Sequence, residues 1–145
     1  MNMLDALDKI EISSDYFLVS AFMEEGKDAW TFMFFCKADN TVIDFRVGES
    51  VEKGSAQNAA NIPNHENFQE LDVNIKIDHL SATEKARSKI HSKPSAIYAA
   101  LTMKNGSPAW SISFICLDLN AYIFDIDAKS GEIMKEDSFS LFTKL

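Results

Sequence analysis

Three histidines are the side chains best suited to bind a transition metal or to transfer a proton near neutral pH. His65, His79 and His91 stand at none of the spacings that place two ligands on one metal ion, such as His-x-x-x-His or a paired cysteine and histidine. His65 and its neighbour Glu66 lie in a polar stretch that predicts a loop. We therefore expect no metal site.

Short catalytic and nucleotide-binding motifs do not occur either. The five glycines form no phosphate-binding loop, and there is no Gly-x-Ser-x-Gly segment. Asp125 and Asp127 alternate along a predicted strand, which favours a solvated face. Residues 127–131 predict a turn in which Asp and Ser oxygens accept hydrogen bonds from nearby amides and Gly131 takes a left-handed conformation. We predict no catalytic residue, no cofactor and a protein that is not an enzyme.

Two residue types occur only twice each, with one shared spacing. Trp30 is separated from Trp110 by the same stretch of sequence that separates Cys36 from Cys116. Both thiols share a strand face with large aromatic residues, where cysteine acts as a small hydrophobic group. The predicted structural core of these strands is Trp30, Phe34, Cys36, Trp110, Phe114 and Cys116. A disulfide between the cysteines is an open alternative that a reducing compartment would oppose.

The equal spacings reveal an internal repeat, because a shift of the sequence by this spacing aligns residues 23–36 with 103–116. Between residues 23 and 43, eight residues are identical in the second copy: Met23, Gly26, Ala29, Trp30, Phe34, Cys36, Asn40 and Ile43. Apolar residues alternate in both segments, as in strands with one buried face.

Further strands are predicted on both sides of these two, at residues 16–23, 42–47, 96–103 and 122–128. The turns at Gly26 and at Asn105-Gly106 predict hairpins. The third strands of the two copies match best when the spacing is lengthened by one position, which aligns Asp44-Phe45 with Asp125-Ile126.

A helix is predicted ahead of each hairpin. In the second copy Ser81 and Glu84 have the spacing of a capping box. Apolar residues follow from Ala82 at helical spacing, and Pro94 is expected to end the helix. In the first copy the candidate helix covers residues 3–10.

The remaining segments lie between and after the copies. Residues 54–69 predict a loop or partly disordered linker. Residues 70–78 alternate polar and apolar, which predicts a half-buried strand. Residues 138–145 predict one more edge strand.

The end of the second copy, Asp127-Ala128-Lys129-Ser130-Gly131 after a strand, resembles the PepSY domain family, as does the aromatic after the turn at Pro108-Ala109-Trp110. The resemblance covers residues 80–135 and, more faintly, 3–51, where residues 46–50 lack the Asp-x-Lys-Ser-Gly turn. It implies a cystatin-like arrangement of a helix on an antiparallel sheet, and a link to peptidase regulation, usually outside the cytoplasm. The strand pattern also fits a profilin-like or other α+β fold.

We therefore predict an α+β fold of two tandem helix-plus-antiparallel-strand units, cystatin- or PepSY-like, packed as one domain. The first repeat spans residues 1–53, a loop or linker 54–69, and the second repeat, with an extra leading strand, 70–145.

The outer faces of the central strands carry apolar residues beyond what a solvated sheet needs: Met33, Phe35, Ile115 and Leu117. We expect the helices to cover one face of each unit and the two units to meet on the other. The alternative is an apolar surface left open for a partner, which makes these four the candidate binding residues.

Charge limits the partners. The 145 residues carry a net charge of −8 and a sequence pI near 4.8, which argues against nucleic acid and anionic membranes. No apolar run reaches membrane-span length, and the acidic start of the chain does not read as a secretory signal. We expect a cytoplasmic location.

The leading functional hypothesis is a non-enzymatic binding or regulatory module that engages a protein, a peptidase among the options, or a second copy through an edge strand. The alternative is a small-ligand-binding protein with a pocket between helix and sheet. An enzyme with a site dispersed over the fold is a third option.

Overall fold

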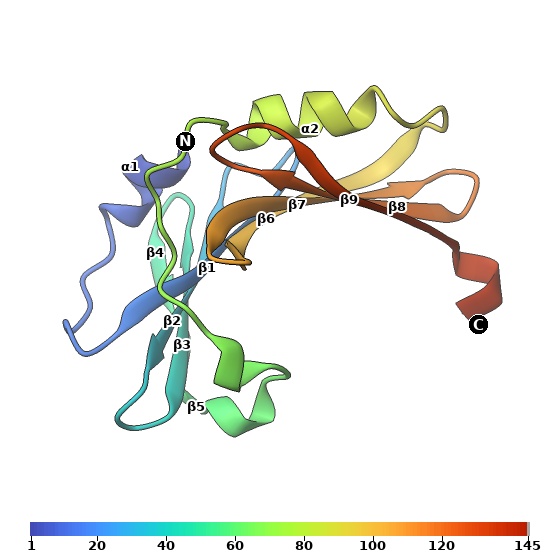
Figure 1. The fold of residues 1–145 in the computed structure, drawn as a ribbon. Coiled ribbons are helices and arrows are strands. Elements are labelled where there is room, and N and C mark those ends of the chain that lie inside the picture. The colour runs from blue at the N-terminus through green and yellow to red at the C-terminus, as the bar shows by residue number, and fades with distance from the viewer. Residues whose placement is uncertain (145) are drawn as a thin grey trace.

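The computed structural model describes residues 1–144 as mainly one antiparallel β-sheet (Figure 1). Its strand order is β4-β3-β2-β1-β6-β7-β8-β9, and β5 pairs with β3. The strands are β1 (Phe17–Glu24), β2 (Trp30–Cys36), β3 (Thr41–Val47), β4 (Val51–Lys53), β5 (Gln57–Asn58), β6 (Pro94–Lys104), β7 (Ser107–Cys116), β8 (Asn120–Asp127) and β9 (Ile133–Ser140). The helices are α1 (Met3–Leu7) and α2 (His79–Arg87), with short 3-10 helices η1 (Ala59–Asn61), η2 (His65–Asn67) and η3 (Leu141–Lys144).

The predicted α+β fold of two cystatin- or PepSY-like helix-plus-strand units is wrong, because strands dominate the described chain. α1 has only five residues and α2 has nine. Helices this short depend on packing for their stability, since they form few internal hydrogen bonds. The second helix ends at Arg87, and Pro94, which was expected to end it, begins β6 instead.

The two halves of the sheet join edge to edge through antiparallel pairing of β1 with β6 (Figure 1). Ala21 lies opposite Leu101, and Met23 lies opposite Ala99. The expectation that the halves meet through their outer faces is therefore wrong. Strand pairing joins them, and the sheet continues from β4 to β9.

The register shows how the two copies correspond. Phe32 pairs with Phe45 in the first half, and Ile112 pairs with Phe124 in the second. Phe124 therefore occupies the place of Phe45, so the spacing of the third strands is shorter than that of the tryptophans, and the predicted lengthening is wrong. The turn after β7 is shorter by one position than the turn after β2, which the apolar pattern alone does not reveal.

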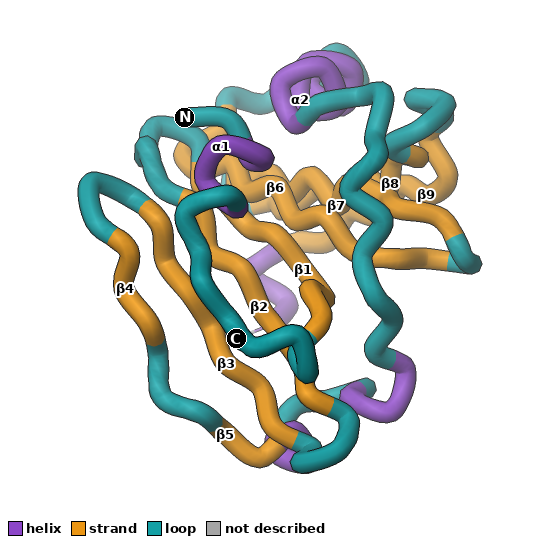
Figure 2. Tube along the Cα trace, turned by 90° about the vertical axis from the view of Figure 1, so that its left-hand side faces the viewer, coloured by secondary structure: helices purple, strands orange, loops and turns teal. Residues whose placement is uncertain are grey.

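The inner face of the sheet carries the main core, which α1, α2 and residues 70–78 cover (Figure 2). The strand predicted at residues 70–78 is wrong, because this segment lies against the sheet but does not join it. Its Leu71 amide donates to the Leu18 carbonyl at 2.8 Å, and its Ile77 amide donates to the Ala128 carbonyl at 2.9 Å. The alternating apolar side chains pack on the core from above the sheet.

A second, smaller core lies on the outer face of the first half. Phe35 is buried there, with its ring 5.6 Å from that of Phe17 and 5.2 Å from that of Phe68, between centroids. Phe68 belongs to the predicted loop, residues 54–69, which contains β5, η1 and η2. The chain itself thus covers the apolar outer positions of β2.

Turn residues behave as their chemistry predicts. Asn105 and Gly106 have φ of 52° and 78°, which the predicted Asn-Gly hairpin requires. The predicted turn at residues 127–131 is confirmed, since Asp127 Oδ1 accepts hydrogen bonds from two nearby backbone amides at 2.8 and 2.9 Å. Gly131 has φ of 79°. The last strand, β9, lies earlier than the predicted 138–145, and residue 145 falls outside the described residues.

Candidate functional site

Trp30 and Trp110 lie side by side on the inner face, although they come from β2 and β7 on either side of β1 and β6. Their ring centroids are 6.3 Å apart, and both side chains are almost fully buried. Each indole N–H donates to a carbonyl just ahead of a helix: Trp30 to Met1 at 3.1 Å, and Trp110 to Ile77 at 2.8 Å. The repeated tryptophans therefore hold the starts of α1 and α2 against the sheet.

His79, the first residue of α2, packs on this pair. Its ring meets Trp30 edge to face, with centroids 5.1 Å apart, and lies 6.1 Å from Trp110. Loss of water lowers the pKa of His79, against the opposing effect of the Asp78 carboxylate. The imidazole is therefore neutral near pH 7.

Neither ring nitrogen of His79 has a hydrogen-bond partner among residues 1–144, and neither is sealed from solvent. The two capping side chains nearby are engaged through their oxygens. Asn2 caps α1 by accepting from the Asp5 amide, and Asp78 caps α2 by accepting from the Ser81 amide, both at 2.8 Å.

The predicted capping box is therefore wrong, because Ser81 lies inside the helix and Asp78 takes the cap position. The hydrogen bond from the Ser81 amide is the main cause that lowers the pKa of Asp78. The Met1 ammonium pairs with Asp28 at 2.8 Å.

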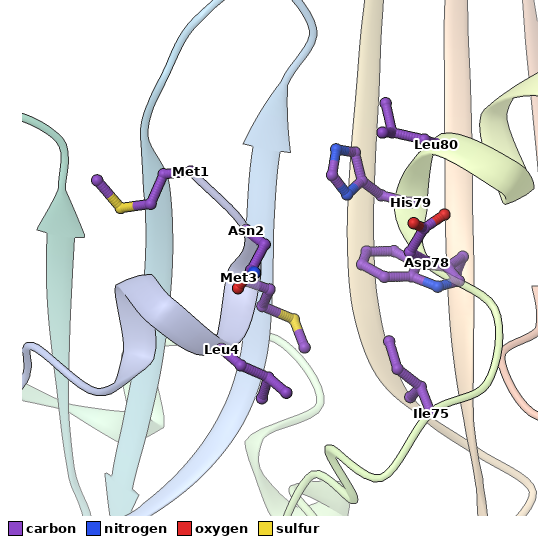
Figure 3. A pocket seen from close by; sticks show the side chains of 9 residues that line it. Met1, Asn2, Met3, Leu4, Ile75, Asp78, His79 and Leu80 are labelled. Atoms are coloured by element: carbon purple, nitrogen blue, oxygen red, sulfur yellow. The ribbon is translucent and has the colours of Figure 1, made fainter.

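These groups surround a cleft of about 500 Å³ between the two helix starts (Figure 3). It is lined by Met1, Asn2, Met3, Leu4, Ile75, Asp78, His79, Leu80 and Trp110. Figure 3 shows residues 1–4 on one side, with the His79 ring turned toward them from the other. Leu4 and Leu80 are exposed at this site. The cleft is thus a mainly apolar space in which the neutral His79 imidazole has no hydrogen-bond partner among the described residues.

The structure does not bring the four candidate binding residues together. Phe35 is buried, and Met33 packs partly against the same outer core under residues 54–69. Ile115 and Leu117 lie at the far end of β7, Ile115 partly exposed and Leu117 65% exposed.

The six predicted core residues, Trp30, Phe34, Cys36, Trp110, Phe114 and Cys116, are all buried. The two thiols are free. Burial is the larger of two causes that raise the pKa of Cys116, and the nearby Asp118 is the other. A thiol in this state is a poor nucleophile.

The other histidines stand apart from the cleft. His65 lies 3.3 Å from Glu66 and 3.1 Å from the Ile62 carbonyl, and His91 is exposed. No cluster of three or more His, Cys, Asp or Glu suited to a metal ion occurs within residues 1–144. In the same range, neither helix has the length and apolar character needed to cross a bilayer.

A polar cluster on the outer face was not foreseen. Lys104 Nζ lies 2.9 Å from both Asp125 Oδ1 and Ser111 Oγ, and Ser111 donates to Asp125 at 2.7 Å. The cluster acts as a cross-strand ion pair. Its signal, Ser111 opposite Asp125, appears only once the register is known.

The site therefore emerges from side chains that the sequence analysis had treated separately. Trp30 and Trp110 were placed in the core by their spacing, whereas His79 and Asp78 carried no motif. The only available signal was the repeat, which implied that Trp30 and Trp110 occupy equivalent positions but not that they meet.

No protein-family model matches the chain, and no curated protein matches it. Among solved structures, the fold is similar to a crystal structure from Clostridium difficile 630 described as a "putative lipoprotein". The TM-score is 0.63, with 16% identity over 86% of this chain and 84% of that chain. Likeness at this identity shows a shared fold alone. The PepSY resemblance stays a prediction, and so does the cytoplasmic location, which this neighbour does not support.

Proposed function

We propose that this protein is a non-enzymatic binding module that holds a small, uncharged, mainly apolar molecule in the cleft between α1 and α2. The observation that carries the proposal is the neutral His79 imidazole, which is unpaired at the wall of an apolar cleft of about 500 Å³. Small-ligand pockets combine such apolar walls with a few polar groups that fix orientation.

The lining also selects against negative charge. The Asp78 carboxylate is held ionised by its capping hydrogen bonds and repels an anion. The Met1 ammonium is already paired with Asp28, so it offers little compensation. A hydroxyl or similar group that bonds His79, attached to an apolar body, fits this arrangement best.

The test uses four ligands that share one ring: toluene, phenol, benzoate and benzylammonium. We expect phenol to bind about tenfold more tightly than toluene through the His79 hydrogen bond, and benzoate to bind worst. NMR shifts of the methyl groups of Ile75 and Leu80, which both line the cleft, measure binding. His79→Phe should remove the preference for phenol while toluene still binds.

Two surface variants complete the design. Leu80→Lys should weaken toluene and phenol, whereas Leu117→Lys, equally exposed at 65% but at the far end of β7, should change neither. The proposal fails if no ligand saturates the Leu80 signals, or if His79→Phe leaves the preference for phenol intact.

A further inference from the structure

Exposed apolar side chains gather where β7 turns into β8. Leu117 is 65% exposed and Leu119 is 41% exposed, and Phe142 of η3, also 65% exposed, follows directly on a residue hydrogen-bonded to this turn. Between the two leucines lies the exposed Asp118, whose carboxylate accepts hydrogen bonds from Ser92 and from Asn120. We call the surface formed by Ile115, Leu117, Leu119 and Phe142 the end patch.

The first half of the molecule contains an equivalent region, which can be compared with the end patch. The Leu141 amide donates to the Leu119 carbonyl at 2.8 Å, and the Ala59 amide donates to the Asn40 carbonyl at the same distance. The strand residues before these amides also correspond, because β9 pairs with the start of β8 as β5 pairs with the start of β3. η3 is therefore the counterpart of η1.

Beyond this point the two halves differ. After η1 the chain continues over the outer face and places Phe68 against Phe35, with ring centroids 5.2 Å apart. The residue that corresponds to Phe35 is Ile115, which stays partly exposed. Ile115 belongs to neither apolar cluster of the described residues, whereas Phe35 is part of the outer core.

The turn holds an apolar residue in a backbone conformation that disfavours it. Leu119 has φ of 64°, in the left-handed region that suits Asn and Gly but costs a bulky residue about 1 kcal/mol. Its counterpart Asn40 has φ of 53° and is the residue type that tolerates this conformation. A leucine kept exposed at the expense of stability points to an interaction.

We propose that the end patch binds an extended peptide segment of a partner protein, which lays an aromatic side chain on Ile115 as Phe68 lies on Phe35. The segment follows the path that residues 59–68 take in the first half. This proposal does not depend on the cleft.

The probe is a synthetic peptide with the sequence of residues 57–70, added to the intact protein, whose first-half face already holds its own copy. We expect saturable one-to-one binding that shifts the methyl signals of Ile115 and Leu117. The peptide with Phe68→Ala and the protein variant Leu117→Lys should each lose affinity about tenfold. Leu80→Lys, equally exposed, should bind the peptide as the unmodified protein does.

A second variant guards against misfolding. Leu119→Asn should raise the melting temperature by about 3 °C, because asparagine tolerates the left-handed conformation better than leucine. The same variant should bind the peptide more weakly. The proposal is overturned if shifts appear at Val19 and Phe35 instead, which would mean exchange with the chain's own segment. It is also overturned if the peptide does not bind, or if Leu117→Lys abolishes a dimer instead of peptide binding, which would assign the patch to a second copy.

Discussion

His79 illustrates how a single side chain takes its properties from the tertiary structure. Its ring is half-buried against a pair of tryptophans that are far apart in the sequence. Burial lowers its pKa below 6.5, while the charges that act on it are the Asp78 carboxylate, the amino terminus and Glu25. Nothing in its local sequence distinguishes it from His65 or His91.

The lowered pKa of His79 has a consequence for stability. Below about pH 6.5 the unfolded chain binds the proton before the folded protein does, so stability falls as the pH drops toward the lowered folded pKa, and this contribution levels off below it. His79→Gln should make the urea midpoint depend less on pH between about pH 7 and 5. Asp44, whose pKa burial raises, acts in the opposite direction in both proteins and cancels in the comparison.

His91→Gln is the matched control, since that residue is exposed. An unmodified protein and a His79→Gln variant with the same pH slope would show that His79 titrates alike in the folded and unfolded states.

At the scale of residues, the sequence identified the structural tryptophans and cysteines because their types are rare and their spacing is shared. It also identified the Asn105-Gly106 hairpin and the Asp127 turn, whose chemistry is local. The cleft was not predictable, because it needs the distance between Trp30 and Trp110.

At the scale of elements, pattern predicted burial better than it predicted pairing. The alternation over residues 70–78 correctly marks which side chains face the core, yet the segment lies across the sheet and not within it. A strand within a sheet and a segment packed on the face of a sheet can both bury alternate side chains. Periodicity alone therefore cannot distinguish the two arrangements.

The start of α2 offers a test at this scale. Asp78→Ala should lower the free energy of unfolding by about 1 kcal/mol, because the Ser81 amide loses the acceptor that caps the helix. Ser81→Ala should change it less, since the backbone amide of Ser81, which makes the stronger hydrogen bond to Asp78, is kept and only the weaker bond of its side chain is lost. Urea denaturation at pH 7 measures both. A larger loss in Ser81→Ala would restore the capping box that the sequence suggested.

At the scale of the whole molecule, the repeat was visible but its assembly was not. Edge strands of two units can pair, or their faces can pack, and both satisfy the same apolar pattern. The pairing of Ala21 with Leu101 between β1 and β6 shows that the two units join through their edge strands. The single sheet and the contact between Trp30 and Trp110 leave no boundary at which one half could unfold alone.

The two buried thiols can be used to test whether the two halves unfold together. Cys36 lies in the first half and Cys116 in the second, and each is at most 2% exposed. If the sheet unfolds as one unit, a thiol reagent should modify both cysteines at one rate, with the same dependence on urea, because both wait for the same global opening. Mass spectrometry of the two peptides in the unmodified protein measures the rates without mutation. Labelling of Cys116 well ahead of Cys36 in dilute urea would instead show that β6–β9 open while β1–β4 stay folded, and that strand pairing across β1–β6 is too weak to couple the halves.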